Sequence, residues 1–254
     1  MPDTEAIASL EEAGFASWPA ETEWRDDGFV IRLSPALPYK RCSSVNFSLQ
    51  PTSDPVAALS RARSAFNKAK VGFCIRQTPL MPAALGSLMD AEGWPSHGHS
   101  HVMTVALPCQ GQPDPGPVIS AYEPDSLWLD AYGAYARALQ HRSAFAGVLK
   151  RIVPAAVYLS IVDGSRIVAV GITVIDGDLA GLFGIAVDSA RKREGLGERL
   201  SRHALQIAAQ RGARIGWLQV EAANAPAIAL YSKIGFTTAY SYCYRVPPAN
   251  NDRP

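Results

Sequence analysis

A segment rich in proline and glycine divides the chain into two stretches of regular hydrophobic periodicity. Residues 107–117 contain four prolines and two glycines, a composition typical of a connection between domains. We therefore predict a first domain of residues 1–108, a linker of residues 109–117, a second domain of residues 118–248 and a flexible tail of residues 249–254. A chain of 254 residues is long enough for two modest domains, each with its own core.

Both stretches have the mixed pattern of helices and strands that predicts an α/β (α+β) fold. In the first, hydrophobic spacing predicts helices over residues 4–16, 54–70 and 82–92 and strands over residues 28–33, 43–49, 71–76 and 101–107. In the second, it predicts helices from Asp125 and over residues 141–152, 195–211 and 225–233, with strands over residues 118–122, 156–162, 167–174, 180–187, 214–221 and 236–246. Asp-Gly connections favour antiparallel hairpins in the second stretch. Both stretches contain the order strand, strand, helix, strand, helix, strand, so an internal duplication is one interpretation.

Charge and cysteine usage exclude several classes of protein. Lys and Arg number 24 and Asp and Glu 23, so no net field attracts nucleic acid or an anionic membrane. No apolar run approaches the roughly 18 residues of a membrane span, and the first residues do not resemble a signal peptide, so we predict a cytoplasmic protein without a membrane or nucleic-acid partner. The four cysteines form no CxxC pair, which fits free thiols.

Three alternating histidines raise the possibility of a metal site. His97, His99 and His101 would share one face of a strand, and paired histidines bind zinc or copper. No acidic residue or cysteine stands nearby in sequence, so solvated histidines are the favoured interpretation, and no metal is predicted.

A glycine turn is the first feature that carries chemistry. Gly195 and Gly197 lie where an apolar strand has ended and a helix begins, and Lys192 and Arg193 add positive charge beside them. The N-terminus of a helix presents unpaired N–H groups and the positive end of the helix dipole, which suits a phosphate. On its own the turn is more typical of a surface loop with solvated charges.

A second motif follows one strand later and changes this balance. Residues 224–236 read NAPAIALYSKIGF, and together with residues 192–197 they resemble the GNAT superfamily of acyl-CoA-dependent N-acyltransferases. Asn224, Ala227, Leu230, Tyr231, Gly235 and Phe236 occupy the positions of that family's second motif. Lys192 stands where the first motif usually has Arg or Gln, and it keeps the charge without the rigid fork of an arginine.

The resemblance implies how acetyl-CoA, or another short acyl-CoA, would be held. The end of the strand before the turn would pair with the pantetheine arm, and the turn would hold the pyrophosphate largely through backbone N–H groups. The implied cofactor-binding residues are Ile185, Ala186, Val187, Lys192, Arg193, Glu194, Gly195, Leu196, Gly197, Glu198, Asn224, Ala227 and Tyr231.

The resemblance also implies direct transfer of the acetyl group to a primary amine in a ternary complex. Tyr231 matches the usual general acid, and Glu221, at the end of the strand before it, is the nearest candidate for a general base. A water chain could replace Glu221. The acceptor could be a small-molecule amine or a peptide, and the protein a monomer or a homodimer. The alternative is a catalytically silent module that binds acyl-CoA.

The first half contains no comparable glycine turn. Trp18-Pro19, Asp27-Gly28-Phe29 and residues 41–46 and 101–107 resemble the front part of a bacterial GNAT subgroup built from two tandem halves, of which only the second keeps the cofactor motif. We therefore expect two GNAT-like halves, each a mostly antiparallel sheet flanked by helices, and no CoA binding of this kind in the first. Tyr240, Tyr242 and Tyr244 share one strand face and either line an acceptor cleft or, as we favour, pack against neighbouring strands.

Overall fold

The computed structural model describes residues 3–37, 39–50, 52–109, 117–136 and 139–248. Most of the predicted linker (110–116) and the predicted tail (249–254) lie outside these residues. The chain forms two compact units. Unit 1 comprises residues 1–101, 221–223 and 239–254, and unit 2 comprises residues 102–220 and 224–238. The units are therefore not the two contiguous stretches of the sequence prediction, because residues 102–108 belong to unit 2 and residues 239–248 to unit 1.

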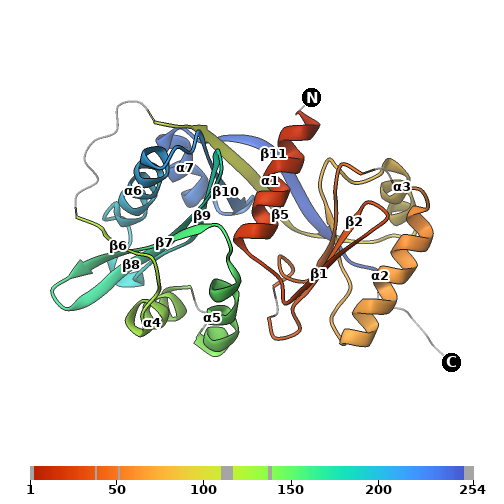
Figure 1. The fold of residues 1–254 in the computed structure, drawn as a ribbon, viewed down its shortest axis with the longest axis horizontal. Coiled ribbons are helices and arrows are strands. Elements are labelled where there is room, and N and C mark those ends of the chain that lie inside the picture. The colour runs from red at the N-terminus through yellow and green to blue at the C-terminus, as the bar shows by residue number, and fades with distance from the viewer. Residues whose placement is uncertain (1–2, 38, 51, 110–116, 137–138, 249–254) are drawn as a thin grey trace. The chain divides into compact units, whose positions relative to one another are not determined.

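Unit 1 is a sheet covered by helices (Figure 1). Its elements are α1 (Thr4–Ser17), β1 (Thr22–Asp26), β2 (Phe29–Leu33), β3 (Ser44–Phe47), α2 (Pro55–Ala69), β4 (Ile75–Gln77), α3 (Ala83–Ala91), most of β5 (Ser96–Ala106) and most of β11 (Thr237–Arg245). The strand order is β1-β2-β3-β4-β11-β5. β1, β2 and β3 pair antiparallel, β3 and β4 pair in parallel, and β4 and β11 pair antiparallel.

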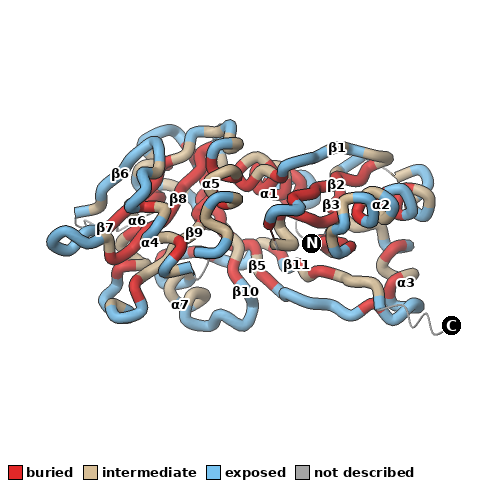
Figure 2. The backbone as a smooth tube through the Cα atoms, turned by 90° about the horizontal axis from the view of Figure 1, so that it is seen from below, coloured by how far each residue is buried: buried red, intermediate tan, exposed pale blue. Residues whose placement is uncertain are grey.

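The core of unit 1 lies between the central strands and helices α2 and α3. Phe29 and Phe47 meet edge to face at 5.0 Å between ring centroids, and they pack in one cluster with Phe66 of α2 and Met89 of α3. β2 is buried throughout, whereas β1, which lies at the edge of the sheet, is largely exposed (Figure 2). β1 is not predicted from the sequence, because its residues TEWRD are mostly charged.

The predicted row of tyrosines lies on β11 and is buried in unit 1. Arg76 of β4 donates two hydrogen bonds to Glu11 of α1, of 2.7 and 2.9 Å, and the Tyr240 hydroxyl donates to the same carboxylate at 2.6 Å. The Arg76 guanidinium also lies 3.4 Å from the centroid of the Tyr242 ring. These contacts offset the free-energy cost of burying the two charged groups, which would be large for a buried charge without a partner. The row therefore packs inside the protein, as the sequence analysis favoured.

Unit 2 is a second sheet with helices on both faces. Its elements are β6 (Ile119–Ala121), α4 (Ser126–Tyr135), α5 (Arg142–Arg151), β7 (Ala155–Asp163), β8 (Arg166–Asp176), β9 (Leu179–Val187), α6 (Leu196–Gln210), β10 (Ile215–Glu221) and α7 (Ala225–Ile234), with short 3-10 turns at Leu139–His141 and Ser189–Arg191. The strand order is β5-β10-β9-β8-β7-β6. β6 to β9 pair antiparallel, and β9 and β10 pair in parallel.

Helices α6 and α7 lie on one side of this sheet and α4 and α5 on the other (Figure 1). Leu200 and Ala204 of α6 pack against Leu159 of β7 and Leu182 of β9 in the main core cluster. On the other side, Trp128 of α4 is buried and donates its indole N–H to the Leu159 carbonyl at 2.9 Å. Successive apolar side chains of the strands point to opposite faces of the sheet and therefore pack against both layers of helices.

The two units confirm the predicted fold class: tandem GNAT-like halves, each a mostly antiparallel sheet flanked by helices. In both, a hairpin precedes a strand, a helix, a parallel strand and a second helix. Two strands are divided between the units. β5 begins in unit 1 and ends in unit 2, and β11 begins in unit 2 and ends in unit 1. Among the described residues, no helix has the length and apolar character needed to cross a membrane.

Candidate active site

The glycine turn forms the N-terminus of α6 in unit 2. Gly195 is the N-cap residue with φ 76°, in the left-handed region that glycine adopts at no steric cost, and no side chain caps the helix. Within the described chain, nothing accepts a hydrogen bond from the N–H groups of Leu196, Gly197 or Glu198. The turn therefore presents free N–H donors at the positive end of a 15-residue helix, which is the arrangement that binds phosphate.

The charged residues of the turn divide into two groups. Lys192 and Arg193 are exposed and form no ion pair with a described residue, so their charges are available to an anion. Glu194 accepts hydrogen bonds from Arg191, and Glu198 accepts from Arg202 at 3.0 Å and from Lys233 of α7 at 2.8 Å.

These partners lower the pKa of both carboxyls: Arg191 does so for Glu194, and Lys233 followed by Arg202 does so for Glu198. The carboxylates of both predicted cofactor-binding glutamates are thus paired with arginine or lysine side chains of the protein, and only their backbone groups remain available to a cofactor.

Arg191, which the sequence analysis passed over, anchors the turn to the sheet. Its guanidinium donates to Asp163 at the end of β7 at 2.5 Å and to Glu194 at 2.8 Å. Two ion pairs from one arginine fix the loop before the helix, although both partners are exposed and each pair contributes little to stability alone.

The parallel strands β9 and β10 separate before they end. Their register runs from Leu179 opposite Ile215 to Leu182 opposite Leu218, and no pair follows. β9 continues for five more residues along β8, with Val187 opposite Ala169. The side of Ile185, Ala186 and Val187 that would face β10 is therefore left without a partner strand, which is the edge to which an extended arm can be added.

A bulge in β9 lies beside this opening. Val170 of β8 pairs with Ala186, whereas Ile172 pairs with Phe183, so that Gly184 and Ile185 together oppose one residue of β8. Gly184 has φ 58°, and a Cβ there would lie 2.8 Å from the ring of Tyr132 on α4. A bulge redirects backbone N–H groups away from the ladder. The signal for it in the sequence was a glycine inside an apolar strand.

The end of β9, the glycine turn and α7 come together. A Cβ built on Gly197 would lie 3.4 Å from Leu230 of α7, 3.8 Å from Ile185 and 3.9 Å from Val187. The absence of a side chain at Gly197 therefore keeps space between the strand end and α7. This grouping of three elements was expected from the resemblance alone.

Helix α7 positions Tyr231. Asn224 caps the helix by accepting a hydrogen bond from the Ala227 N–H at 3.2 Å, and Gly235, with φ 113°, ends it. Asn224 thus has a structural role in which its side chain is occupied, and Ala227 packs on the core cluster. The ring of Tyr231 contacts Phe236 at 5.8 Å between centroids.

Burial raises the pKa of Tyr231 to about 12. No hydrogen bond joins the Tyr231 hydroxyl to any residue in the described part of the chain. The phenol therefore stays protonated at neutral pH and is free to donate.

Glu221 is exposed at the end of β10 and takes part in no ion pair among the residues that the structure describes. It belongs to unit 1, whereas Tyr231 belongs to unit 2. The three histidines also lie in unit 1: His97 and His99 are exposed, and the Nδ1 of His101 is 2.8 Å from the Ser241 hydroxyl. Within the described ranges, no group of three His, Cys, Asp or Glu side chains could hold a metal ion, and none of the four cysteines forms a disulfide bond.

Comparisons with known proteins extend these observations. The family described as "Probable histone acetyltransferase Rv0428c C-terminal" matches residues 4–245. The [ribosomal protein bS18]-alanine N-acetyltransferase of Escherichia coli (strain K12) is 43% identical over 77 residues, which are 30% of this chain and 52% of that protein. The streptothricin acetyltransferase of Streptomyces lavendulae is 38% identical over 88 residues, 29% of this chain and 45% of that protein. The chain thus spans about half the length of these relatives.

Solved structures share the fold over nearly the whole chain. A GCN5-related N-acetyltransferase from Kribbella flavida superposes with a TM-score of 0.70 at 18% identity, covering 98% of this chain and 97% of that one. A tandem GNAT protein from the clavulanic acid biosynthesis pathway superposes with a TM-score of 0.67 at 12% identity, covering 98% and 91%. The match over residues 4–245 places the chain in the family "Probable histone acetyltransferase Rv0428c C-terminal", and the chain shares the fold of GCN5-related N-acetyltransferases (GNAT).

Proposed function

We propose that the protein is an N-acetyltransferase that transfers the acetyl group of acetyl-CoA, or of a similar short acyl-CoA, directly to a primary amine. The observation that carries the proposal is the combination, in unit 2, of the separated strands β9 and β10 with the uncapped N-terminus of α6. Family membership and the acetyltransferases among the relatives support the reaction class.

The residues at this site fit an acyl-CoA. Backbone N–H groups of Leu196, Gly197 and Glu198, with Lys192 and Arg193 nearby, would hold the pyrophosphate. The free edge of Ile185–Val187 would pair with the amide-containing arm, in the space that Gly197 keeps open. When bound, the cofactor supplies an acetyl thioester whose carbonyl is open to attack by an amine.

The chain's own residues then have three roles. Backbone N–H groups at the β9 bulge are suited to stabilise negative charge on a carbonyl oxygen. Tyr231, protonated because burial raises its pKa to about 12, is suited to donate a hydrogen bond as negative charge builds on the departing sulfur. Glu221 is the proposed general base, with water as the alternative route for the proton of the amine. Tyr231 and Asn224 to Phe236 are proposed as parts of this site on the strength of the resemblance and the geometry of α7.

Release of free thiol from acetyl-CoA, measured against a panel of small amines, amino acids and peptides, tests the proposal. We expect release that depends on the acceptor and a product whose mass increases by one acetyl group. Tight CoA binding without any acceptor-dependent thiol release across the panel would favour the alternative, a catalytically silent acyl-CoA-binding module.

A further inference from the structure

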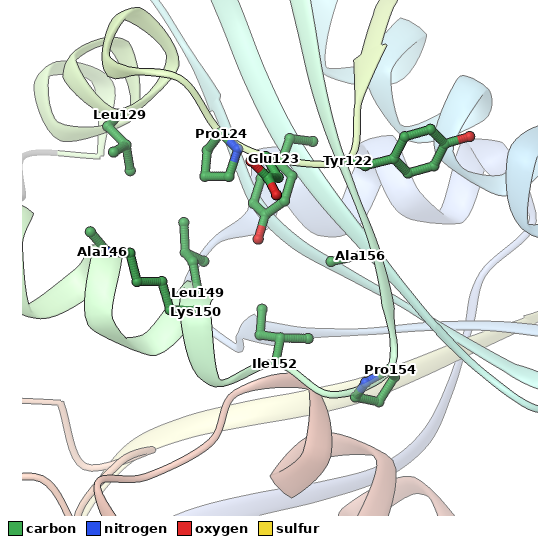
Figure 3. A pocket seen from close by; sticks show the side chains of 11 residues that line it. Tyr122, Glu123, Pro124, Leu129, Ala146, Leu149, Lys150, Ile152, Pro154 and Ala156 are labelled. Atoms are coloured by element: carbon green, nitrogen blue, oxygen red, sulfur yellow. The ribbon is translucent and has the colours of Figure 1, made fainter.

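A pocket of about 460 Å³ opens in unit 2 on the side of the sheet that carries α4 and α5. Glu123, between β6 and α4, and Leu129 of α4 border it on one side, and Ala146, Leu149 and Lys150 of α5 border it on another (Figure 3). Tyr158 of β7 also lines the pocket. The volume falls within the range of small-molecule sites, and the lining joins apolar surface to a few polar groups, as such sites do.

Three polar groups of the pocket lack partners. Glu123 and Lys150 form no ion pair with each other or with another described residue. Tyr158 is 4% exposed, and its hydroxyl takes part in no hydrogen bond within the described ranges. The ring is buried, but the hydroxyl oxygen is not fully enclosed by the protein, and Tyr158 lines the pocket. The pocket therefore holds a carboxylate, an ammonium group and a phenol that a ligand could satisfy.

The carboxylate and the phenol influence each other across the pocket. Burial raises the pKa of Tyr158, and the negative charge of Glu123 raises it further. Tyr158 is thus a hydrogen-bond donor at neutral pH, beside an anion that favours a positively charged ligand group. Lys150, on α5, supplies the opposite charge.

The pocket and the glycine turn at the start of α6 lie on opposite sides of the sheet of unit 2 (Figure 1). Trp128 packs edge-on against Tyr158 at 5.4 Å and stacks on Tyr132 at 5.6 Å between centroids. Tyr132 in turn lies against Gly184 at the β9 bulge. In the sheet, β8 lies between β7 and β9. The pocket is therefore a site of its own and not part of the opening between β9 and β10.

We propose that this pocket binds a small zwitterion with an apolar body, of the class of apolar amino acids and their dipeptides. The ligand's ammonium group would pair with Glu123 and its carboxylate with Lys150, while the side chain would pack on Leu129 and Leu149. A volume of about 460 Å³ accommodates a side chain of the size of leucine or phenylalanine. The proposal goes beyond the proposed acetyltransferase function and does not depend on it.

Calorimetric titration of the full chain, without acetyl-CoA, tests the site. The probes are leucine, phenylalanine and leucyl-leucine, with N-acetyl-leucine and leucinamide as forms that lack one charge. We expect the zwitterions to bind at least about tenfold more tightly than either blocked form, since each form loses one charge-assisted contact. Equal affinity for zwitterions and blocked forms, or no binding of any zwitterion, would overturn the proposal.

Two variants assign the contacts. Glu123→Gln should weaken the binding of leucine and leucinamide about tenfold and leave that of N-acetyl-leucine unchanged. Lys150→Met should weaken the binding of leucine and N-acetyl-leucine about tenfold and leave that of leucinamide unchanged. Glu5→Gln and Lys68→Met, exposed changes in unit 1, are the matched controls. Wild-type affinities in both pocket variants would contradict the site.

Acetylation of a bound zwitterion in the presence of acetyl-CoA, abolished by Glu123→Gln, would contradict the separation of the two sites. Because the binding measurement needs no acetyl-CoA, a failure of acetyl transfer leaves it interpretable.

Discussion

The N-termini of helices α2 and α6 occupy the same place in the two units and have opposite chemistry. In unit 2, α6 begins at a glycine whose side chain cannot cap it. In unit 1, Asp54 caps α2 by accepting a hydrogen bond from the Ala57 N–H at 3.0 Å, and Pro55 at the first turn has no N–H to offer. Of the first three N–H positions of α2, one is missing at Pro55 and one, at Ala57, is occupied by the cap.

Asp27 is a second difference between the two helix N-termini, because its carboxylate lies next to the start of α2. Its carboxylate accepts hydrogen bonds from the N–H and hydroxyl groups of Ser53, at 2.9 and 2.8 Å, and from the N–H of Asp54 at 2.9 Å. These bonds, the one from the Ser53 backbone first, lower the pKa of Asp27. A carboxylate of the protein therefore takes the donors that a phosphate would use. The parallel strands separate in unit 1 as well, since β3 and β4 share only the pair Val45 and Ile75.

Strand separation is present in both units, so the difference between them lies at the N-terminus of the following helix. The charge at the helix N-terminus decides whether an anion can bind. This difference supports the expectation that only unit 2 holds CoA through a glycine turn, and it gives the following predictions, from the largest effect to the smallest.

Removal of the Tyr231 hydroxyl should have the largest effect. Helix α3, the counterpart of α7 in unit 1, contains no tyrosine, so no equivalent acid exists there. Tyr231→Phe should reduce acceptor-dependent thiol release about 100-fold or more with little change in CoA affinity. Steady-state kinetics measures the rate, and Tyr122→Phe, at an exposed tyrosine of the same unit, is the control. An unchanged rate would remove Tyr231 from the mechanism.

A carboxylate placed at the start of α6 should make it resemble α2. Gly195→Asp would add a negative charge at the predicted pyrophosphate site, so CoA should bind at least about tenfold more weakly in calorimetry. Gly212→Asp is the matched control, because both glycines have positive φ and open space around the Cβ position. Equal losses in both variants would show that strain, and not charge, causes the effect.

The reverse change in unit 1 should cost stability. Asp27→Asn keeps the size of the side chain but removes the charge that accepts three hydrogen bonds, so thermal unfolding at neutral pH should begin a few degrees lower. Because the folded-state pKa of Asp27 is lowered, its contribution is present above the unfolded pKa and is lost as pH falls through the folded value. The difference between the two proteins should therefore disappear in acid. A difference in unfolding temperature that stays the same from neutral pH into acid would assign it to another cause.

The pH dependence of the reaction should show the smallest change. Since the pKa of Tyr231 is raised to about 12, this phenol stays protonated over the ordinary range. The value of kcat/KM should rise with pH as the amine loses its proton and should not fall again below about pH 10.5. A descending limb near pH 9 that Tyr231→Phe removes would contradict the raised pKa.

Local signals explain what the sequence predicted well. The boundaries of α6 and α7 follow from Gly195, Asn224 and Gly235, which cap or end the helices through their own backbone and side-chain chemistry. Asp125 likewise caps α4 by accepting from the Trp128 N–H at 2.7 Å.

What the sequence did not predict depends on distant partners. β1 is an edge strand whose pairing with β2 compensates for its charged residues. Lys233 pairs with Glu198 over 35 positions of the sequence, and Ser53 donates to Asp27 over 26, so no periodicity connects these partners. The pocket near Tyr158 arises from a loop, two helices and a strand, none of which carries a motif.

Strands β5 and β11, each divided between the units, have a consequence for how the chain can fold during synthesis. Arg76 and Glu11 of unit 1 are covered by tyrosines of β11, which lies about 160 residues later in the chain than β4. When the ribosome has made only residues 1–108, Arg76 and Glu11 are therefore present without the tyrosines of β11 that bury them. Unit 1 can reach its final state only after the region around Tyr240 has been made, so the two halves must mature together and a cut in the linker should leave neither complete.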